Sequence, residues 1–414
     1  MIRFLIFCQL FTSLYGQKIF EEFEKDRNNK YHYKETYRFD SVTDDGTYTL
    51  SIENVEGDIL VKGHHGSGMV LNITQKIKAV TEKRAKKYIK ENKIQVFHSE
   101  EDNLVQAGFK KKVHYRRGVS TEFELEVPSN IQLNLETAGG DIEAMHIRGE
   151  SILKTSGGDI ELKSLSGRID AQTAGGDMAL ENIEGLIRVH TSGGDIEINH
   201  SDGQFNASTS GGDLDFTNLT GNVEAQSSGG SILLENIQGN TIQARTAGGD
   251  IEVEDVTANI QGATSGGEIS LENVKGNVDV TTSGGDIELD EITGDLICHT
   301  SGGEIEGDNI IGTIDATTFS GDIDLRLGYD SHISNYGFNV QTNTGDIYVQ
   351  LPSAFPVYVD AEVFGSSSTH DLTSDIPLNI STKDNRVVGS GSLNDGTIPM
   401  KLRASFGTIT IELE

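Results

Sequence analysis

The chain has 414 residues, including 48 glycines, 5 prolines and no tryptophan, and its formal net charge is -31 at pH 7. This charge argues against a nucleic-acid partner or an anionic membrane surface, because phosphate binding needs clustered Lys and Arg. It favours cationic partners, divalent metal or simple solubility. Abundant glycine at fixed positions, with little proline, indicates turns in a repeat rather than a disordered linker.

Residues 1–16 have the features of a secretory signal peptide. A basic residue, Arg3, precedes a mostly apolar run, and the small Gly16 precedes a cleavage site at Gln17. The run is shorter than the roughly 20 residues that a transmembrane helix needs. The mature chain would keep one cysteine, Cys298, so no disulfide can form within it. We therefore expect an exported protein without a transmembrane segment in the mature chain.

Residues 17–136 are expected to form an N-terminal cap made of irregular coils. Residues 17–32 are charged and mixed, which predicts a short helix or a disordered lead. Residues 80–92 combine strong helix formers with an apolar side, which predicts one surface helix. Alternation in segments such as 48–52 and 123–127 predicts strands. A cap of this kind would cover the open end of a repeat array and protect its unpaired edge.

Residues 137–326 contain a regular repeat. The heptad Thr-Ser-Gly-Gly-Asp-Ile-Glu stands at 155–161, 191–197 and 282–288, and variants recur every 18 residues apart from one step of 19. Apolar residues recur every nine positions, with a second apolar residue two positions later. A spacing of two indicates strands, so each 18-residue coil has two short strands and two turns. Stacked coils about 4.8 Å apart would bury one continuous core.

The turns and polar columns of the repeat suggest structural roles. One turn is the Gly-Gly pair and the other contains a single glycine, which we interpret as corners that need positive φ. Thr residues precede each Gly-Gly pair, and we interpret them as a stacked hydrogen-bond ladder. An asparagine column predicts a second ladder, formed by Asn182, Asn218, Asn236, Asn273 and Asn309.

Residues 327–414 are expected to form irregular C-terminal coils and a cap. Residues 342–348 are the last clear copy of the repeat. The alternating segments 357–361 and 400–411 predict two further coils. The stretch 364–396 between them is rich in Ser, Asp, Asn and Gly, which predicts a loop excursion.

This order of elements resembles the "putative adhesin" families of bacterial β-solenoid proteins, the domain of unknown function 4097 group in particular. The resemblance covers most of the mature chain and rests on residues 57–61, 127–130, the Gly-Gly-Asp copies and residues 405–411. It implies an exported, right-handed, parallel β-solenoid with an adhesive role. It supplies no catalytic residues.

Two columns of acidic residues are the main candidate for a site. An acidic residue follows most Gly-Gly pairs, Asp in seven coils and Glu at Glu268 and Glu304, and in most coils a second acidic residue stands two positions on; both columns are expected to face outward. Stacked carboxylates repel unless cations or hydrogen bonds offset them, so one interpretation is a face that binds calcium or a polycation. The alternative is that each Asp accepts backbone N–H groups in its turn. The calcium β-roll pattern matches only in part, because its glycine between Gly-Gly and Asp is missing. The candidate metal ladder consists of Asp141, Asp159, Asp177, Asp195, Asp213, Asp250 and Asp286.

The outward face of the second strand is polar and variable, which makes it a candidate binding surface. Its members are Arg168, Arg188, His190, Gln204, Asn222, Gln243, Arg245, Gln261 and His299. A catalytic set is not evident, because the acids repeat without one unique pair and few insertions are available to build a cleft. The histidines show no metal-ligand spacing, and Cys298 replaces Ala in a core column, as a buried thiol would.

We therefore expect an exported, noncatalytic bacterial β-solenoid, in the periplasm, on the outer-membrane surface or outside the cell. It would present an extended face to a glycan, an envelope polymer or a surface protein. The alternative is a structural envelope component without a soluble ligand. A polysaccharide-degrading enzyme ranks third, and it would require a groove beside residues 364–396 lined by two unequal carboxylates.

Overall fold

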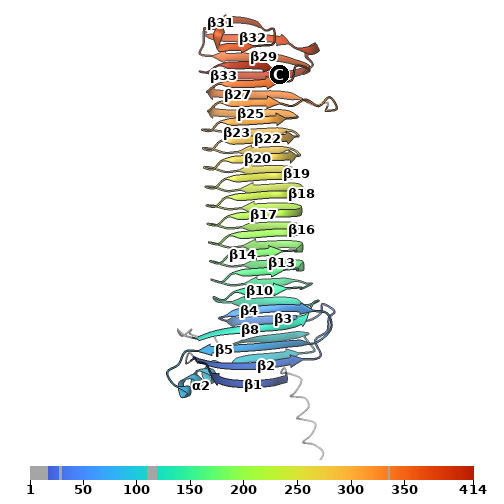
Figure 1. The fold of residues 1–414 in the computed structure, drawn as a ribbon, viewed down its shortest axis with the longest axis vertical. Helices are drawn as coiled ribbons and strands as arrows, with labels where there is room; N and C mark the ends of the chain where they lie inside the picture. The colour runs from blue at the N-terminus through green and yellow to red at the C-terminus, as the bar shows by residue number, and fades with distance from the viewer. Residues whose placement is uncertain (1–16, 28–29, 110–118, 334–335) are drawn as a thin grey trace, which may run out of the picture. The chain divides into compact units, whose positions relative to one another are not determined.

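The computed structural model describes residues 17–27, 30–109, 119–333 and 336–414. The chain divides into two compact units, Met1–Thr209 and Ser210–Glu414. The expected signal peptide lies outside the described residues. In both units nearly all regular structure is β, and successive coils pair as parallel strands (Figure 1). The predicted all-β solenoid is therefore confirmed, whereas the boundaries at 136 and 326 stay predictions.

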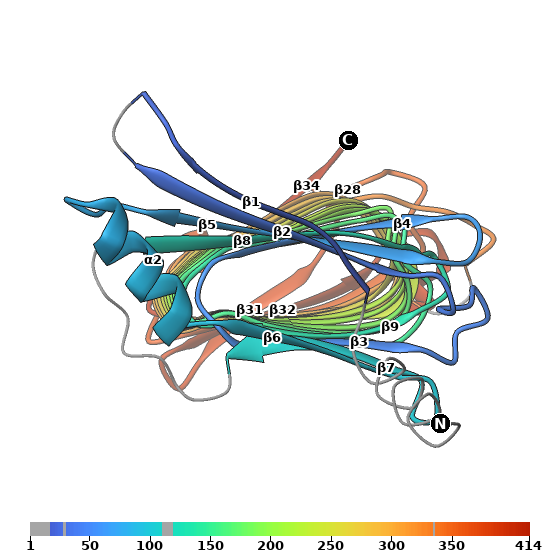
Figure 2. The ribbon, with the colours of Figure 1, turned by 90° about the horizontal axis from the view of Figure 1, so that it is seen from below.

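The first unit consists of two strand ladders that enclose a thin core. In spatial order, one ladder contains β1, β2, β5, β8, β4, β10, β12, β14 and β16 (Gln17–Lys25, Tyr31–Phe39, Met69–Ile77, Val119–Pro128, Asp58–His64, Ile142–Met145, Ile160–Lys163, Met178–Glu181 and Ile196–Ser208). The other contains β6, β7, β3, β9, β11, β13 and β15 (Ile94–Ser99, Leu104–Phe109, Thr49–Val55, Gln132–Thr137, Ser151–Lys154, Ser166–Gln172 and Glu184–His190), and it also ends on β16. Figure 2 shows β2, β5 and β8 on one side and β3, β7 and β9 on the other.

The N-terminal cap continues both ladders with antiparallel strands. The predicted helix is α2 (Glu82–Glu91), whose Ala85 packs on Tyr31 and Ile77. The prediction of a helix or disordered lead for residues 17–32 was wrong. Residues 17–25 form β1, because the free edge of β2 offers them a complete set of backbone partners.

The second unit has the same two ladders. One contains β17, β18, β19, β20, β22, β24, β26, β28, β34 and β30 (Leu214–Gln226, Ile232–Arg245, Ile251–Ala263, Ile269–Lys275, Ile287–Thr293, Ile305–Ile310, Ile323–Leu327, Ile347–Leu351, Ile409–Leu413 and Leu372–Ser374). The other begins with the C-terminal halves of β17, β18 and β19 and continues with β21, β23, β25, β27, β33, β29, β32 and β31 (Val278–Thr281, Leu296–Thr300, Thr313–Ser320, Gly337–Thr344, Ile398–Ser405, Val357–Phe364, Arg386–Ser392 and Asn379–Lys383).

The C-terminal coil is inserted out of sequence order. β33 pairs in parallel with both β27 and β29, so the last strands of the chain lie beneath an earlier segment (Figure 1). The segment 364–396 is not the predicted loop. It forms β30, β31 and β32 with two short 3₁₀ helices, Thr369–Asp371 and Asn394–Gly396, and β31 and β32 extend the ladder as a hairpin.

The predicted inner columns are confirmed as the core. In the first unit Ile142, Ile160, Met178 and Ile196 stand in register and are all buried. Each of these side chains covers its neighbours along the stack, so no coil buries its apolar face alone. Cys298 continues such a column in the second unit and is fully buried, and burial raises the pKa of its thiol.

The threonine ladder is confirmed, and its hydroxyl groups link the backbones of successive coils. The buried Thr155 Oγ1 donates to the carbonyl oxygen of Gly140, 2.8 Å away in the preceding coil, and accepts from the N–H of Gly158. Asparagine recurs in its column for a second reason. Its members occupy a corner at positive φ, which Asn tolerates well. One direct step of that ladder is Asn236 Nδ2 to Asn218 Oδ1, at 2.7 Å.

The two glycines of each Gly-Gly pair have different roles. Neither Gly157 nor Gly158 has positive φ, so that part of our interpretation was wrong for this turn, although it holds for the single-glycine corner at Gly167 (φ 125°). A Cβ on Gly158 would lie 2.1 Å from the carbonyl oxygen of Gly140, whereas a Cβ on Gly157 would meet nothing within 4 Å. The second glycine therefore permits close stacking of coils.

This difference predicts that substitutions of the two neighbouring glycines change the free energy of unfolding by different amounts. Gly158→Ala should lower the free energy of unfolding by at least about 2 kcal/mol, because the obstructing atoms are backbone. Gly157→Ala is the matched control and should change it by no more than about 0.5 kcal/mol. Denaturant unfolding followed by circular dichroism measures both, and equal losses would contradict this account.

Candidate functional site

The Asp ladder is held by hydrogen bonds between coils. In the first unit the Asp141 carboxylate accepts the backbone N–H of Asp159 at 2.9 Å, and Asp159 accepts that of Asp177 at 2.8 Å. In the second unit Asp250 and Asp286 accept the N–H groups of Glu268 and Glu304, each at 2.8 Å. The ladder therefore supplies acceptors to turn N–H groups that strand pairing leaves over. This matches the second of our two interpretations.

The outward carboxylates still repel one another. Burial raises the pKa of Glu268, and the charges of Glu288, Asp250 and Asp286 act in the same direction. Throughout the described ranges, no group of three or more His, Cys, Asp or Glu side chains is placed to hold a metal ion. The calcium ladder remains a prediction that only a binding measurement tests.

Substitutions at Asp159 separate hydrogen bonding from cation binding. Asp159→Ala removes the acceptor for the Asp177 N–H and should cost about 1 kcal/mol of unfolding free energy. Asp159→Asn keeps an acceptor oxygen but removes the charge, so it should cost much less. Thermal unfolding with and without millimolar calcium measures both effects. If calcium raised the melting temperature of the wild type and not of Asp159→Asn, the ladder would bind metal after all.

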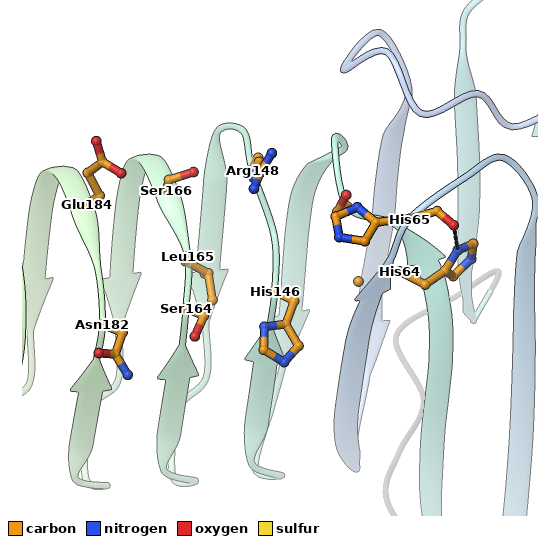
Figure 3. A pocket seen from close by; sticks show the side chains of 11 residues that line it. His64, His65, His146, Arg148, Ser164, Leu165, Ser166, Asn182 and Glu184 are labelled. Atoms are coloured by element: carbon orange, nitrogen blue, oxygen red, sulfur yellow. Dashed lines mark hydrogen bonds between the residues drawn. The ribbon is translucent and has the colours of Figure 1, made fainter.

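A groove follows one corner of the first unit and was not predicted. It has a volume of about 500 Å³ and spans the coils that contain β10, β12 and β14. Figure 3 shows two rows of side chains along it, and His64 and His65 lie at one end. One row is Arg148, Ser166 and Glu184, and the other is His146, Ser164 and Asn182.

The repeat explains where the groove forms. His146, Ser164 and Asn182 occupy the corner column, with φ of 59°, 57° and 56°. The small side chains of Ser164 and Ser166 leave space between the larger residues of the coils on either side. Histidine and asparagine are enriched at positive φ, whereas serine is not, so Ser164 carries local strain.

The loop that joins β4 to β5, which lie on either side of β8, forms the end wall. His64 Nδ1 lies 3.2 Å from the carbonyl oxygen of His65, and its Nε2 lies 3.1 Å from that of Gly68. These two contacts hold the His64 ring between backbone carbonyl groups of the loop.

Asp44 links this loop to the turn at Asn130. Its carboxylate accepts the N–H of Asn130 at 2.8 Å, the Asn130 side-chain amide at 2.9 Å and the N–H of Gly66 at 3.1 Å. The backbone bond from Asn130, with the bonds from Gly66 and the Asn130 amide, lowers the pKa of Asp44 below its usual value of 3.8 and outweighs the opposing effect of burial. The position of the wall thus depends on an ionised carboxylate.

We expect the stabilisation by Asp44 to depend on pH. Its folded-state pKa is depressed, so its contribution is present above the unfolded value of about 3.8 and is lost as the pH falls through the folded value. Asp44→Ala should lower the unfolding free energy by about 1–2 kcal/mol at pH 7. Urea unfolding across pH 2–7 should show the gap between wild type and variant closing at the acidic end. The exposed Asp40, paired with Arg38, provides the control Asp40→Ala, for which a gap of similar size would contradict the prediction.

A buried polar cluster at the N-terminal cap was also missed by sequence reasoning. Glu35 is 2% exposed and accepts from the hydroxyls of Tyr33 and Tyr37 at 2.9 and 3.3 Å, while Lys18 pairs with it at 2.6 Å. Burial raises the pKa of Tyr37 to about 12, and the Glu35 charge acts in the same direction. Because its groups satisfy one another inside the cap, we assign the cluster a structural role.

The predicted variable face lies on the outside of each unit. Arg168, Arg188 and His190 are exposed in the first unit, and Asn222, Arg245 and Gln261 are exposed in the second. Arg168 approaches Glu150 at 3.6 Å, and the His190 ring bonds Ser208 at 2.9 Å. The surface is accessible, as predicted, and its groups are largely separate from the Asp ladder.

The region of residues 364–396 has paired rather than unequal carboxylates. Asp360 on β29 lies 2.6 Å from Arg403, and Glu362 lies 2.8 Å from Arg386. Each carboxylate is paired with an arginine, whereas a glycosidase needs two carboxylates in different environments. The arrangement gives no support to the third expectation, a polysaccharide-degrading enzyme.

Comparison with known proteins gave one family match. The model of the Toastrack family, DUF4097, matches residues 47–235 and 218–384. The comparison with curated proteins gave no match. Among solved structures, one described as a "putative cell adhesion protein" from Clostridium sporogenes is 9% identical, covers 92% of this chain and 98% of its own, and has a TM-score of 0.17. The family match alone therefore carries the assignment.

Proposed function

Because the chain belongs to the Toastrack DUF4097 family, we propose that it is an exported, noncatalytic β-solenoid that presents an extended polar surface to a glycan, envelope polymer or surface protein. The observation that carries this proposal is the contrast between inner columns that stay apolar or small and exposed positions that vary in character. Inner positions repeat Ile, Leu, Thr and Gly, whereas outward positions of the second strand include Arg168, His190 and Gln204. Such a scaffold allows the surface to change without changing the core.

The proposal of a noncatalytic role is supported by the chemistry of the acids. Asp141, Asp159 and Asp177 make the same hydrogen bond in successive coils, whereas acid–base catalysis needs groups in different environments. Within the part of the chain that the structure describes, no helix is long and apolar enough to cross a membrane. Export would be directed by residues 1–16.

Binding should be measurable on a glycan array and on isolated bacterial envelope fractions. We expect the exported protein to begin at Gln17 by N-terminal sequencing and to bind at least one glycan or envelope fraction. The double variant Arg168→Glu/Arg188→Glu, on adjacent coils of the variable face, should weaken that binding several-fold. Its matched control, Lys62→Glu/Lys163→Glu, makes the same charge change on the other ladder.

Absence of binding to every glycan and envelope fraction would contradict the proposal and would favour a structural envelope component. Equal losses in the two double variants would show that net charge, rather than the variable face, governs binding.

A further inference from the structure

We propose that the corner groove of the first unit is a subsite for an acidic saccharide, in which Arg148 and His65 bind a carboxylate or sulfate group of the ligand. The inference rests on the proposed binding function and adds the chemical class of the ligand. Three features of the groove support it: a cationic end, a row of hydroxyl and amide groups, and a shape that follows the stack of coils.

The cationic end is unusual in a chain of net charge -31. Arg148, His65 and His146 are exposed and line the groove together. Among the described residues, no carboxylate forms an ion pair with Arg148, although other surface arginines such as Arg386 and Arg403 have such partners. An arginine with open donors is suited to bind a planar carboxylate through two parallel hydrogen bonds.

The rest of the groove offers hydrogen-bonding groups of mixed character. Ser164, Ser166 and Asn182 both donate and accept, and Glu184 at the far end accepts from hydroxyl groups (Figure 3). Sugar hydroxyls have the same mixed character, whereas a purely anionic ligand would be repelled by Glu184. The ligand would therefore place its acidic group at the histidine end.

The length of the groove fits a short oligosaccharide. Arg148 and Glu184 occupy equivalent positions two coils apart, which corresponds to about 10 Å along the stack. At physiological ionic strength the Debye length is about 8 Å, so the repulsion from distant carboxylates is largely screened. A short acidic ligand is thus compatible with the negative charge of the whole chain.

The presence of serine at position 164 supports a ligand-binding role for the open space in the groove. The equivalent corner residue is asparagine in five other coils, at Asn182, Asn218, Asn236, Asn273 and Asn309. Asparagine suits positive φ better than serine, so Ser164 keeps the groove open at some cost in stability. Ser164→Asn should therefore fill the groove without destabilising the first unit.

The test is calorimetric titration of the exported protein with tetragalacturonate, with its fully methyl-esterified form and with a chondroitin sulfate tetrasaccharide. We expect an acidic tetrasaccharide to bind and the neutral ester to bind at least about tenfold more weakly. Arg148→Ala should lower the affinity at least about tenfold, as loss of a charged hydrogen-bond pair does. Higher salt should weaken the binding. The stronger of the two acidic ligands identifies the group as carboxylate or sulfate.

Two matched controls lie in the second unit. Lys275 occupies the corner position equivalent to Arg148, so Lys275→Ala removes a similar charge away from the groove. Glu291 also has positive φ (52°), so Glu291→Asn relieves the same strain as Ser164→Asn. Neither should change the affinity, whereas Ser164→Asn should lower it while the melting temperature stays equal or rises.

Equal binding of the ester, or an Arg148→Ala variant with unchanged affinity, would overturn the inference. If such a result came with binding to other glycans through the variable face, the proposed function would stand and only the groove assignment would fail. If no glycan or envelope fraction bound at all, both would fail.

Discussion

Close contact between the backbones of successive coils is the constraint on which the structure depends. At Gly158 the preceding coil approaches so closely that a single Cβ would collide with the Gly140 carbonyl oxygen. This approach lets Thr155 and Asp159 bridge neighbouring coils through short hydrogen bonds. The same contact recurs at Gly321, Gly345 and Gly407, where the first glycine of the pair has been replaced by Ser, Thr or Phe.

That constraint also explains why so many acidic residues are tolerated. A carboxylate that accepts a backbone N–H from the next coil offsets part of the repulsion along its column. Asp is therefore required less for its charge than for its short side chain, which places an acceptor oxygen beside the backbone N–H of the next coil. The acids that remain free of such roles, such as the outward Glu column, contribute mainly net charge and solubility.

The corner groove arises from the same scaffold by substitution alone. The φ angles at His146, Ser164 and Asn182 are nearly identical, yet their side chains place an imidazole at one end, an open middle and an amide at the far end. A solenoid can thus acquire a binding site without a loop insertion, because a cavity appears wherever a large corner residue is replaced by a small one. The repeat determines the backbone of the groove, and the residues that depart from the repeat determine its side-chain groups.

The sequence by itself determined the coil length, the inner columns, the buried Thr ladder and the single cap helix, because all of these follow from local periodicity. It also pointed to the role of Asp in the turns. Only the tertiary structure decided that β1 is a strand, that β33 lies beneath β29, and that His64, His65, Arg148 and Ser164 share one groove. Those arrangements depend on pairing between segments that are distant in sequence. The hydrophobic pattern of one segment does not determine which free edge or corner it packs against.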